Sequence, residues 1–159
     1  MSHAELIERF LKGPEVMGQA VRNVSPAVLD KVPAPGKWSI RQYLVHVADT
    51  ELAVGSRLRQ VVADPGGNLA AFDQEKWAAS LCYDKQPVED VLAVFAAMRK
   101  VSGNMLRNIP ASAWNNKGIH PKRGEMTLVT LVELATNHCE NHAKKIGELK
   151  AQFGSAAKA

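Results

Sequence analysis

The sequence WSIRQYLVHVADTELAVGSRLRQV, residues 38–61, decides the fold. Ser39 fits the N-cap of a helix, and Gln42 stands three residues later, which is the spacing of a capping box. Trp38 and Tyr43 flank this cap at the positions of a hydrophobic staple. Apolar residues then recur at helical spacing, at Ile40, Leu44, Val47, Val54, Leu58 and Val61. The stretch therefore predicts a long amphipathic helix that ends near the Asp-Pro-Gly-Gly segment, residues 64–67.

Three more segments share this helical periodicity. The first covers residues 4–23, and Gly13–Pro14 predicts a kink or two short helices within it. Another begins near Pro87 and ends before Pro110. The last begins at Thr127, a favourable N-cap, and continues to Gly154.

The connections between these segments carry weaker signals. Ser25–Pro26 predicts a short helical turn, and residues 72–79 predict a short helix with Trp77 facing inward. We interpret residues 111–125 as a loop, and no segment predicts a strand. Four long helices without strands indicate an all-α four-helix bundle, with short extra helices in the loops. The long second and third connections allow a crossover topology.

Length and composition indicate a soluble globular protein. A chain of 159 residues with 46% hydrophobic and 23% charged residues suffices for one domain, which we expect over residues 1–154, with a flexible tail over residues 155–159. No apolar run could span a bilayer, and the N-terminus lacks a signal-peptide pattern. We therefore expect a cytoplasmic protein without a membrane partner.

Charge and cysteine content exclude two further classes. The net charge is only +4 and no basic stripe carries interleaved aromatic residues, so nucleic acid is not an expected partner. A small basic cluster of Lys117, Lys122 and Arg123 is interpreted as a solvated loop. Cys82 and Cys139 form neither a disulfide framework nor a CxxC motif.

Three histidines are candidate metal ligands. His138 and His142 stand four residues apart within the apolar stripe of the last helix, so they can share one face. If the helix that carries His46 packs against that face, three imidazoles converge, as in an open catalytic zinc site. Such a ligand set suits zinc, nickel or another borderline divalent ion. The competing interpretation is that these histidines are separately hydrogen-bonded or hydrated.

Two sharper metal motifs are absent. Cys139 follows His138, where a zincin would have glutamate. The ExxH pairs of di-iron bundles are also missing.

Two acidic residues on the second helix are candidate catalytic groups. Asp49 lies one turn from His46 and could orient a ligand, although it could equally be solvated. Glu51 falls on the apolar stripe. It could act as a general base, but we favour a structural ion pair with Arg99 or Arg107.

Five segments together resemble the DinB/YfiT-like family of metalloproteins. They occur in the same order and spacing as in the family across nearly the whole domain, and they are PGKWSIR at 35–41, LVHVADTE at 44–51, Trp114, GEMTL at 124–128 and HCENH at 138–142. The resemblance implies a crossover four-helix bundle, commonly a homodimer, with one divalent metal held by His46, His138 and His142.

The resemblance determines the fold better than the reaction. Some relatives are metal-dependent transferases or isomerases that use a low-molecular-weight thiol, which implies attack of a metal-activated thiolate on a small electrophilic substrate. The alternatives are a non-catalytic metal-binding or stress-response bundle, and a helical interaction module whose histidines are only packed.

Overall fold

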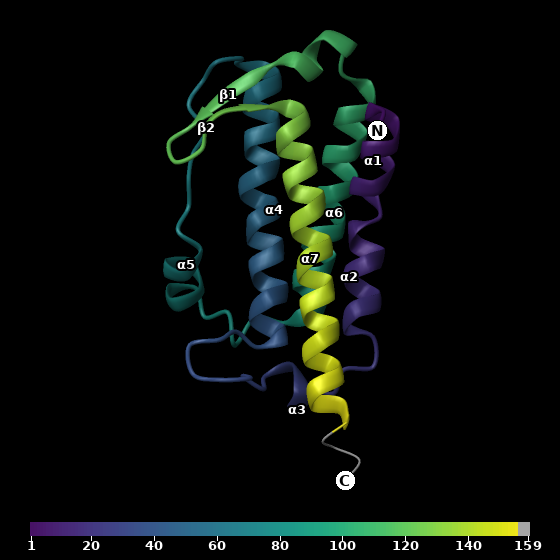
Figure 1. The fold of residues 1–159 in the computed structure, drawn as a ribbon, viewed down its shortest axis with the longest axis vertical. Coiled ribbons are helices and arrows are strands. Elements are labelled where there is room, and N and C mark those ends of the chain that lie inside the picture. The colour runs from purple at the N-terminus through teal and green to yellow at the C-terminus, as the bar shows by residue number, and fades with distance from the viewer. Residues whose placement is uncertain (156–159) are drawn as a thin grey trace.

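A computed structural model describes residues 1–155 of the chain as a bundle of long helices (Figure 1). The bundle helices are α1 (His3–Leu11), α2 (Gly13–Val21), α4 (Ile40–Ala63), α6 (Val88–Asn108) and α7 (Leu128–Ser155). The shorter elements are α3 (Pro26–Leu29), α5 (Gln74–Ser80), the 3-10 helix η1 (Ala111–Asn115) and the strands β1 (Lys117–His120) and β2 (Gly124–Thr127). The predicted tail over residues 155–159 lies outside the described residues, except that Ser155 ends α7.

Four helical rods form the bundle, because α1 and α2 follow one another along one side (Figure 1). Helix α4 packs against α6 and α7, and the α1–α2 rod packs against the same two helices from the opposite side. Two chain connections, from α2 to α4 and from α6 to α7, therefore cross the bundle diagonally. The crossover four-helix bundle predicted from the sequence is confirmed.

The predicted helix boundaries follow their local signals. Ser39 caps α4 through its side chain, and Gln42 completes the capping box. The rings of Trp38 and Tyr43 meet at 5.6 Å between centroids, as the staple predicts. Gly13 begins α2 after the predicted break. Its backbone lies close to the Arg99 side chain, and a Cβ at this position would be only 3.2 Å from Arg99 Nη1, which favours glycine.

The prediction that the chain contains no strand is wrong. Strands β1 and β2 form an antiparallel hairpin within the expected loop, with Gly118 opposite Met126. The segment after α4 joins this hairpin, because the backbone N–H of Leu69 donates to the carbonyl of Ile119 at 2.8 Å. The strands escape prediction because each has only four residues, too few for a clear period-two pattern.

The prediction that Trp77 faces inward is also wrong. Helix α5 has no buried residue, and it lies outside the bundle beside α4 (Figure 1). The half-buried Trp77 ring packs against Phe72 within the same connection, at 4.7 Å between ring centroids. Its apolar surface is thus covered locally.

A buried arginine joins all sides of the bundle. Arg99 on α6 is 1% exposed and donates to the Glu51 carboxylate on α4 at 2.6 Å. It also donates to the carbonyls of Phe10 on α1 and Ala135 on α7, at 2.9 and 2.7 Å. This single side chain therefore hydrogen-bonds to groups on α1, α4 and α7.

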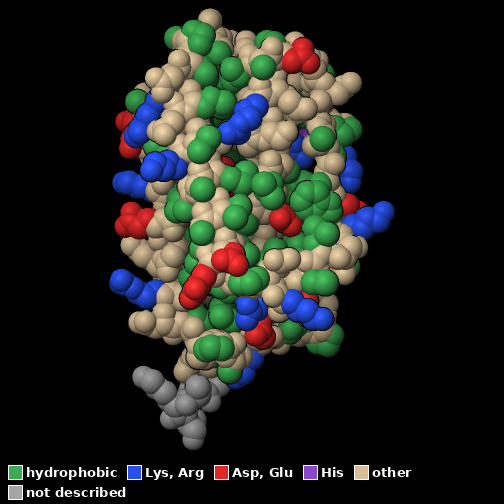
Figure 2. All heavy atoms as spheres, turned by 180° about the vertical axis from the view of Figure 1, so that it is seen from behind, with side chains coloured by type: hydrophobic (Ala, Val, Ile, Leu, Met, Phe, Trp, Pro, Cys, Tyr) green, Lys and Arg blue, Asp and Glu red, His purple; other side chains and the backbone are tan. Residues whose placement is uncertain are grey.

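The face opposite the view of Figure 1 shows no dominant charge. Hydrophobic side chains are spread down it between Lys or Arg and Asp or Glu side chains (Figure 2). Among the described residues, none of the helices combines the length and the apolar character needed to cross a lipid bilayer.

Candidate metal centre

Three imidazoles converge between α4 and α7. His46 Nε2 lies 2.9 Å from His138 Nε2, and His142 Nε2 lies 3.0 Å from the same atom. His138 and His142 share a face because they are one helical turn apart, and the packing of α4 on α7 brings His46 to them. The convergence on which the sequence prediction depended is therefore present.

Aromatic side chains hold the imidazole rings from the outside. The Trp38 ring lies 4.9 Å from the His46 ring, and the Tyr43 ring lies 5.3 Å from the His142 ring, measured between centroids. The residues of the predicted staple thus also form part of the wall of the site.

The electrostatic environment keeps the imidazoles neutral. Burial, aided by the neighbouring His142, lowers the pKa of His46 to about 4. Burial and the adjacent histidines lower the pKa of His138 to about 3, and burial also lowers the pKa of His142. Neutral imidazole is the form that binds metal, so protons do not compete for these nitrogens near pH 7.

The donor set fits a divalent ion. The three nitrogens all lie within 4.8 Å of one another. Two nitrogens that are each about 2.1 Å from one ion lie roughly 3.0–3.4 Å apart for bond angles between about 90° and 110°. The observed separations of 2.9 and 3.0 Å are close to the lower value. Imidazole ligands favour a borderline ion such as zinc or nickel over calcium or magnesium.

Three cavities have at least one of the three histidines in their walls, and two of these cavities are lined by His46. The larger, of about 510 Å³, is lined by His46 and His138 together with residues of the β1–β2 hairpin. The smaller, of about 360 Å³, is lined by all three histidines and by residues 74 and 75 at the start of α5. Small molecules can therefore reach the imidazoles through more than one cavity.

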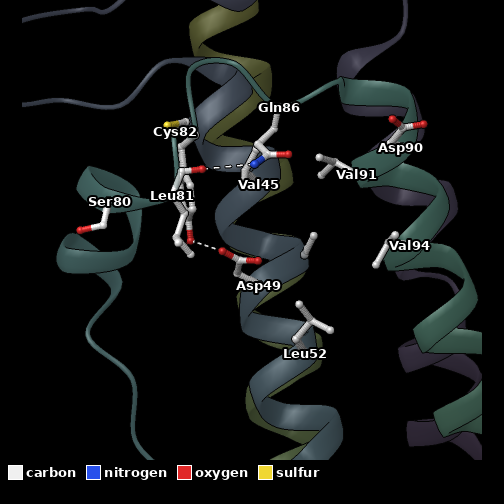
Figure 3. Close-up of a pocket in the computed structure, with 12 residues that line it drawn as sticks. Val45, Asp49, Leu52, Ser80, Leu81, Cys82, Gln86, Asp90, Val91 and Val94 are labelled. Carbon is white, nitrogen blue, oxygen red and sulfur yellow. Dashed lines mark hydrogen bonds between the residues drawn. The ribbon is translucent and has the colours of Figure 1, made fainter.

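The structure does not bring Asp49 to the histidines. Asp49 lies three residues after His46, which rotates it about 60° away around the helix. It accepts a hydrogen bond from the Tyr83 hydroxyl at 2.5 Å and lines a separate cavity between α4 and α6 (Figure 3). Nδ1 of His46 is buried without a hydrogen-bond partner among the described residues, so no carboxylate orients this ring.

Glu51 forms the ion pair with Arg99 that we favoured. Both side chains of the Glu51–Arg99 pair are 2% exposed, and their closest atoms are 2.6 Å apart. Burial raises the pKa of the Glu51 carboxyl, while the Arg99 guanidinium opposes that rise. Neither Glu51 nor Asp49 lines a cavity that the histidines line.

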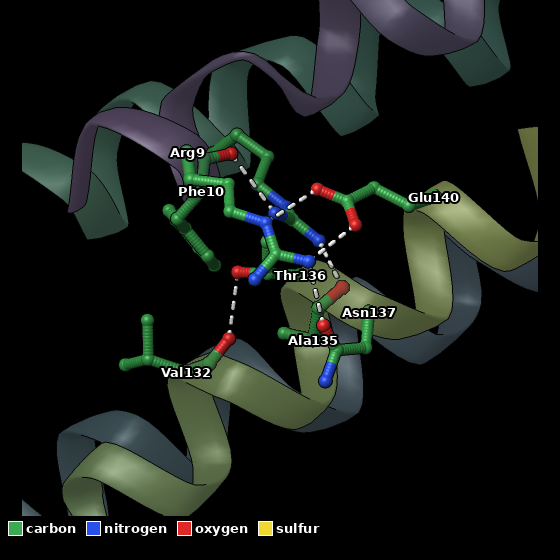
Figure 4. A network of polar contacts seen from close by, with 8 residues as sticks. Arg9, Phe10, Val132, Ala135, Thr136, Asn137 and Glu140 are labelled. Carbon is green, nitrogen blue, oxygen red and sulfur yellow. Dashed lines mark hydrogen bonds and ion pairs between the residues drawn. The ribbon is translucent and has the colours of Figure 1, made fainter. Parts of the chain in front are cut away.

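A second polar network ties α7 to α1. Arg9 donates to both carboxylate oxygens of Glu140 and to the side chain of Asn137 (Figure 4). The Thr136 hydroxyl donates to the carbonyl of Val132 within α7 (Figure 4). The contacts of Arg9 join α1 to α7, whereas the hydrogen bond of Thr136 lies within α7.

Sequence reasoning missed the basic residues of the larger cavity. Lys122 and Arg123, interpreted as a solvated loop, form the turn between β1 and β2 and line this cavity with Arg57 and His120. The position of Lys122 and Arg123 beside α4 could not be predicted without the hairpin. The position of Arg57 could be, because eleven residues separate it from His46 and this spacing puts both on one face of α4.

Comparison with known proteins identifies relatives over most of the chain. A protein of Oceanobacillus iheyensis named "Putative metal-dependent hydrolase OB0413" is 27% identical over 146 residues, covering 89% of this chain and 84% of the relative. A protein of Bacillus mycoides with the same type of name is 24% identical, covering 94% of this chain and 88% of the relative.

Solved structures share the fold. YfiT from Bacillus subtilis, described as a probable metal-dependent hydrolase with an unusual four-helix bundle topology, matches with a TM-score of 0.90 at 21% identity, over 97% of this chain and 90% of YfiT. A mycothiol-dependent maleylpyruvate isomerase matches with a TM-score of 0.74 at 11% identity, over 92% of this chain but only 61% of the isomerase. The model of the DinB superfamily matches residues 9–146, and the chain therefore belongs to the DinB superfamily.

Proposed function

We propose that the protein is a metal-dependent enzyme in which His46, His138 and His142 hold one divalent ion, zinc or nickel. The observation that carries this proposal is the convergence of three neutral Nε2 atoms beside two cavities. The names of the relatives, which refer to metal dependence, support it. We also propose a homodimer, as the family resemblance implies.

The reaction that we favour is transfer to or from a low-molecular-weight thiol. A divalent ion bound by the histidines would lower the pKa of a thiol and generate thiolate at neutral pH. Sulfur would then form a bond to an electrophilic carbon, and the leaving group would depart with the electrons of the broken bond. The two cavities support this assignment because a two-substrate reaction needs room for both reactants.

The smaller cavity has one feature that suits proton transfer. Glu75 is the carboxylate among the described residues that line it, and Gln74 donates to that carboxylate at 3.3 Å. We assign Glu75, rather than Asp49 or Glu51, as the group that accepts the proton of the thiol. The fold shared with a mycothiol-dependent isomerase is consistent with use of a thiol.

Hydrolysis is the second candidate, favoured by the names of the relatives. In that reaction water takes the place of the thiol, and one cavity is sufficient. The two reactions separate when zinc- or nickel-loaded protein is assayed with a panel of electrophiles and esters, with and without added thiols.

The expected result is turnover that requires a thiol and is lost in the variant in which all three histidines are alanine. Turnover without a thiol would favour hydrolysis. No turnover above that of the triple variant would overturn both assignments and leave a non-catalytic metal-binding bundle.

A further inference from the structure

The far end of the larger cavity is strongly basic. Arg57 of α4 and both Lys122 and Arg123 of the β1–β2 turn line it. The one carboxylate among its described lining residues belongs to Asp73, which accepts two backbone N–H groups of α5 at 3.1 Å each. Three cationic side chains therefore line this end of the cavity together with one carboxylate, and that carboxylate already caps α5.

Arg57 is buried without an acidic partner. The residue is 7% exposed, and no ion pair among the described residues includes it. Its Nε donates to the carbonyl of Ala70 at 2.9 Å, and its guanidinium lies 6.0 Å from the centroid of the Phe72 ring. A guanidinium has five N–H donors, so most of its capacity is unused. The Nη atoms are not among the fully buried atoms without a partner, so they reach the open cavity and are available there to an anion.

His120 adds a neutral donor at the same end. Burial and the positive charges of Arg57, Arg123 and Lys122 lower its pKa. Its Nδ1 accepts the backbone N–H of Lys122 at 3.2 Å. The neutral ring must therefore carry its hydrogen on Nε2, where it is available as a donor.

The position of Arg57 relative to the histidines sets the shape of a ligand. Eleven residues separate it from His46 on one face of α4, a rise of roughly 16 Å along the axis. The cavity wall between them carries Thr50 and Val54 from α4 and Leu131 from α7, and the Thr50 hydroxyl is buried without a hydrogen-bond partner among the described residues. Helical side chains lean toward the N-terminus, which brings the guanidinium nearer to the histidines than its Cα.

The geometry points to an elongated small molecule whose oxyanion, a carboxylate or a phosphate, is held by Arg57 while its other end reaches the histidines. This inference rests on the proposed function for the role of the histidines. Arg57 offers the planar fork that binds such anions in bidentate fashion, and Lys122 and Arg123 supply further positive charge. The metal-dependent reaction would thus act on an anionic substrate.

Calorimetric titration of zinc-loaded protein with glutarate, glutaramide and inorganic phosphate tests the inference. Glutarate and glutaramide have similar size and differ in charge. We expect glutarate to bind at least about tenfold more tightly than glutaramide, because a hydrogen bond to a charged group contributes that much. Tighter binding of phosphate than of glutarate would identify a phosphate-type ligand, and the reverse order a carboxylate.

Two variants on one helix make the test specific. Arg57→Gln should weaken glutarate binding by about tenfold to a hundredfold. Arg59→Gln should leave it unchanged, because Arg59 is exposed and donates to the carbonyl of Gly55 away from the cavity. Equal binding of glutarate and glutaramide, or unchanged glutarate binding by Arg57→Gln, would overturn the inference.

Failure of the proposed function is distinguishable from failure of this inference. Zinc content is measured in each sample, and the titrations are repeated on metal-free protein, where a preference for glutarate that requires Arg57 would still support the anion site. If Arg57→Gln does not fold, as judged by circular dichroism, the exposed double variant Lys122→Gln, Arg123→Gln replaces it. Undiminished glutarate binding by that folded double variant would overturn the inference.

Discussion

Removal of the Arg99 side chain should be among the most damaging single changes in the bundle. In Arg99→Met, the Glu51 carboxylate loses its cation while only 2% of its side chain is exposed. Breaking a buried ion pair by removing one partner costs about 3–5 kcal/mol. The carbonyls of Phe10 and Ala135 each lose a donor as well, at 2.9 and 2.7 Å.

These contributions together predict a loss of about 4 kcal/mol in the free energy of unfolding, because the methionine recovers part of the packing. A domain of this size has about 5–15 kcal/mol in total. Urea denaturation followed by circular dichroism measures the change, with a chelator present so that metal binding does not contribute. The matched control is Arg107→Met on the same helix, whose ion pair with Glu8 is 47% and 60% exposed on the two sides. That variant should lose no more than about 1 kcal/mol.

The double variant Arg99→Met, Glu51→Leu sharpens the test. It should be more stable than Arg99→Met alone, because it leaves no buried charge without a partner. A loss below about 1.5 kcal/mol for Arg99→Met, or a loss equal to that of Arg107→Met, would refute the reasoning.

Three further predictions concern pH, the hairpin and assembly. Burial holds the pKa of His46 near 4 and that of His138 near 3, below the 6.5 of a free imidazole, so the unfolded chain binds protons that the folded chain does not. The free energy of unfolding of metal-free protein should therefore fall as the pH drops from about 6.5 toward 4 in urea titrations, and a rise would contradict these pKa values. Gly118→Ala should lower the free energy of unfolding by about 1–3 kcal/mol in the same assay, since a Cβ would lie 2.7 Å from Leu69 Cδ2. The control Gly147→Ala, where a Cβ would meet no atom within 4 Å, should not lower it. Equal effects of the two substitutions would contradict this account of the hairpin. Sedimentation velocity at micromolar concentration should detect the homodimer, and a monomer would remove that proposal.

The helices could be predicted from sequence because their signals are local. The capping box of Ser39 and Gln42 involves residues three apart, and the break at Gly13–Pro14 depends on the backbone of those two residues. The histidine cluster was partly accessible for the same reason, since the spacing of His138 and His142 places both on one face. The contribution of His46 required the packing of α4 on α7, which the family resemblance supplied.

The remaining features depend on tertiary contacts that leave little trace in sequence. The hairpin is held by the segment after α4, which lies about fifty residues away along the chain. Lys122 and Arg123 are exposed, as expected of a solvated loop, but their position beside α4 depends on this contact. Glu51 had two candidate arginines, Arg99 and Arg107, and only the packing of α6 selects the first. Asp49 was assigned to the histidines by proximity in sequence, but its partner is Tyr83 on a distant connection.

Metal content of protein purified without a polyhistidine tag tests the central claim most directly. Elemental analysis should find about one zinc or nickel ion per chain in the wild type, and almost none in His138→Ala. The control variant His120→Asn should keep its metal, because His120 lies outside the cluster of three nitrogens. A wild-type protein that takes up no divalent ion, or a His138→Ala variant that retains a full equivalent, would contradict the account.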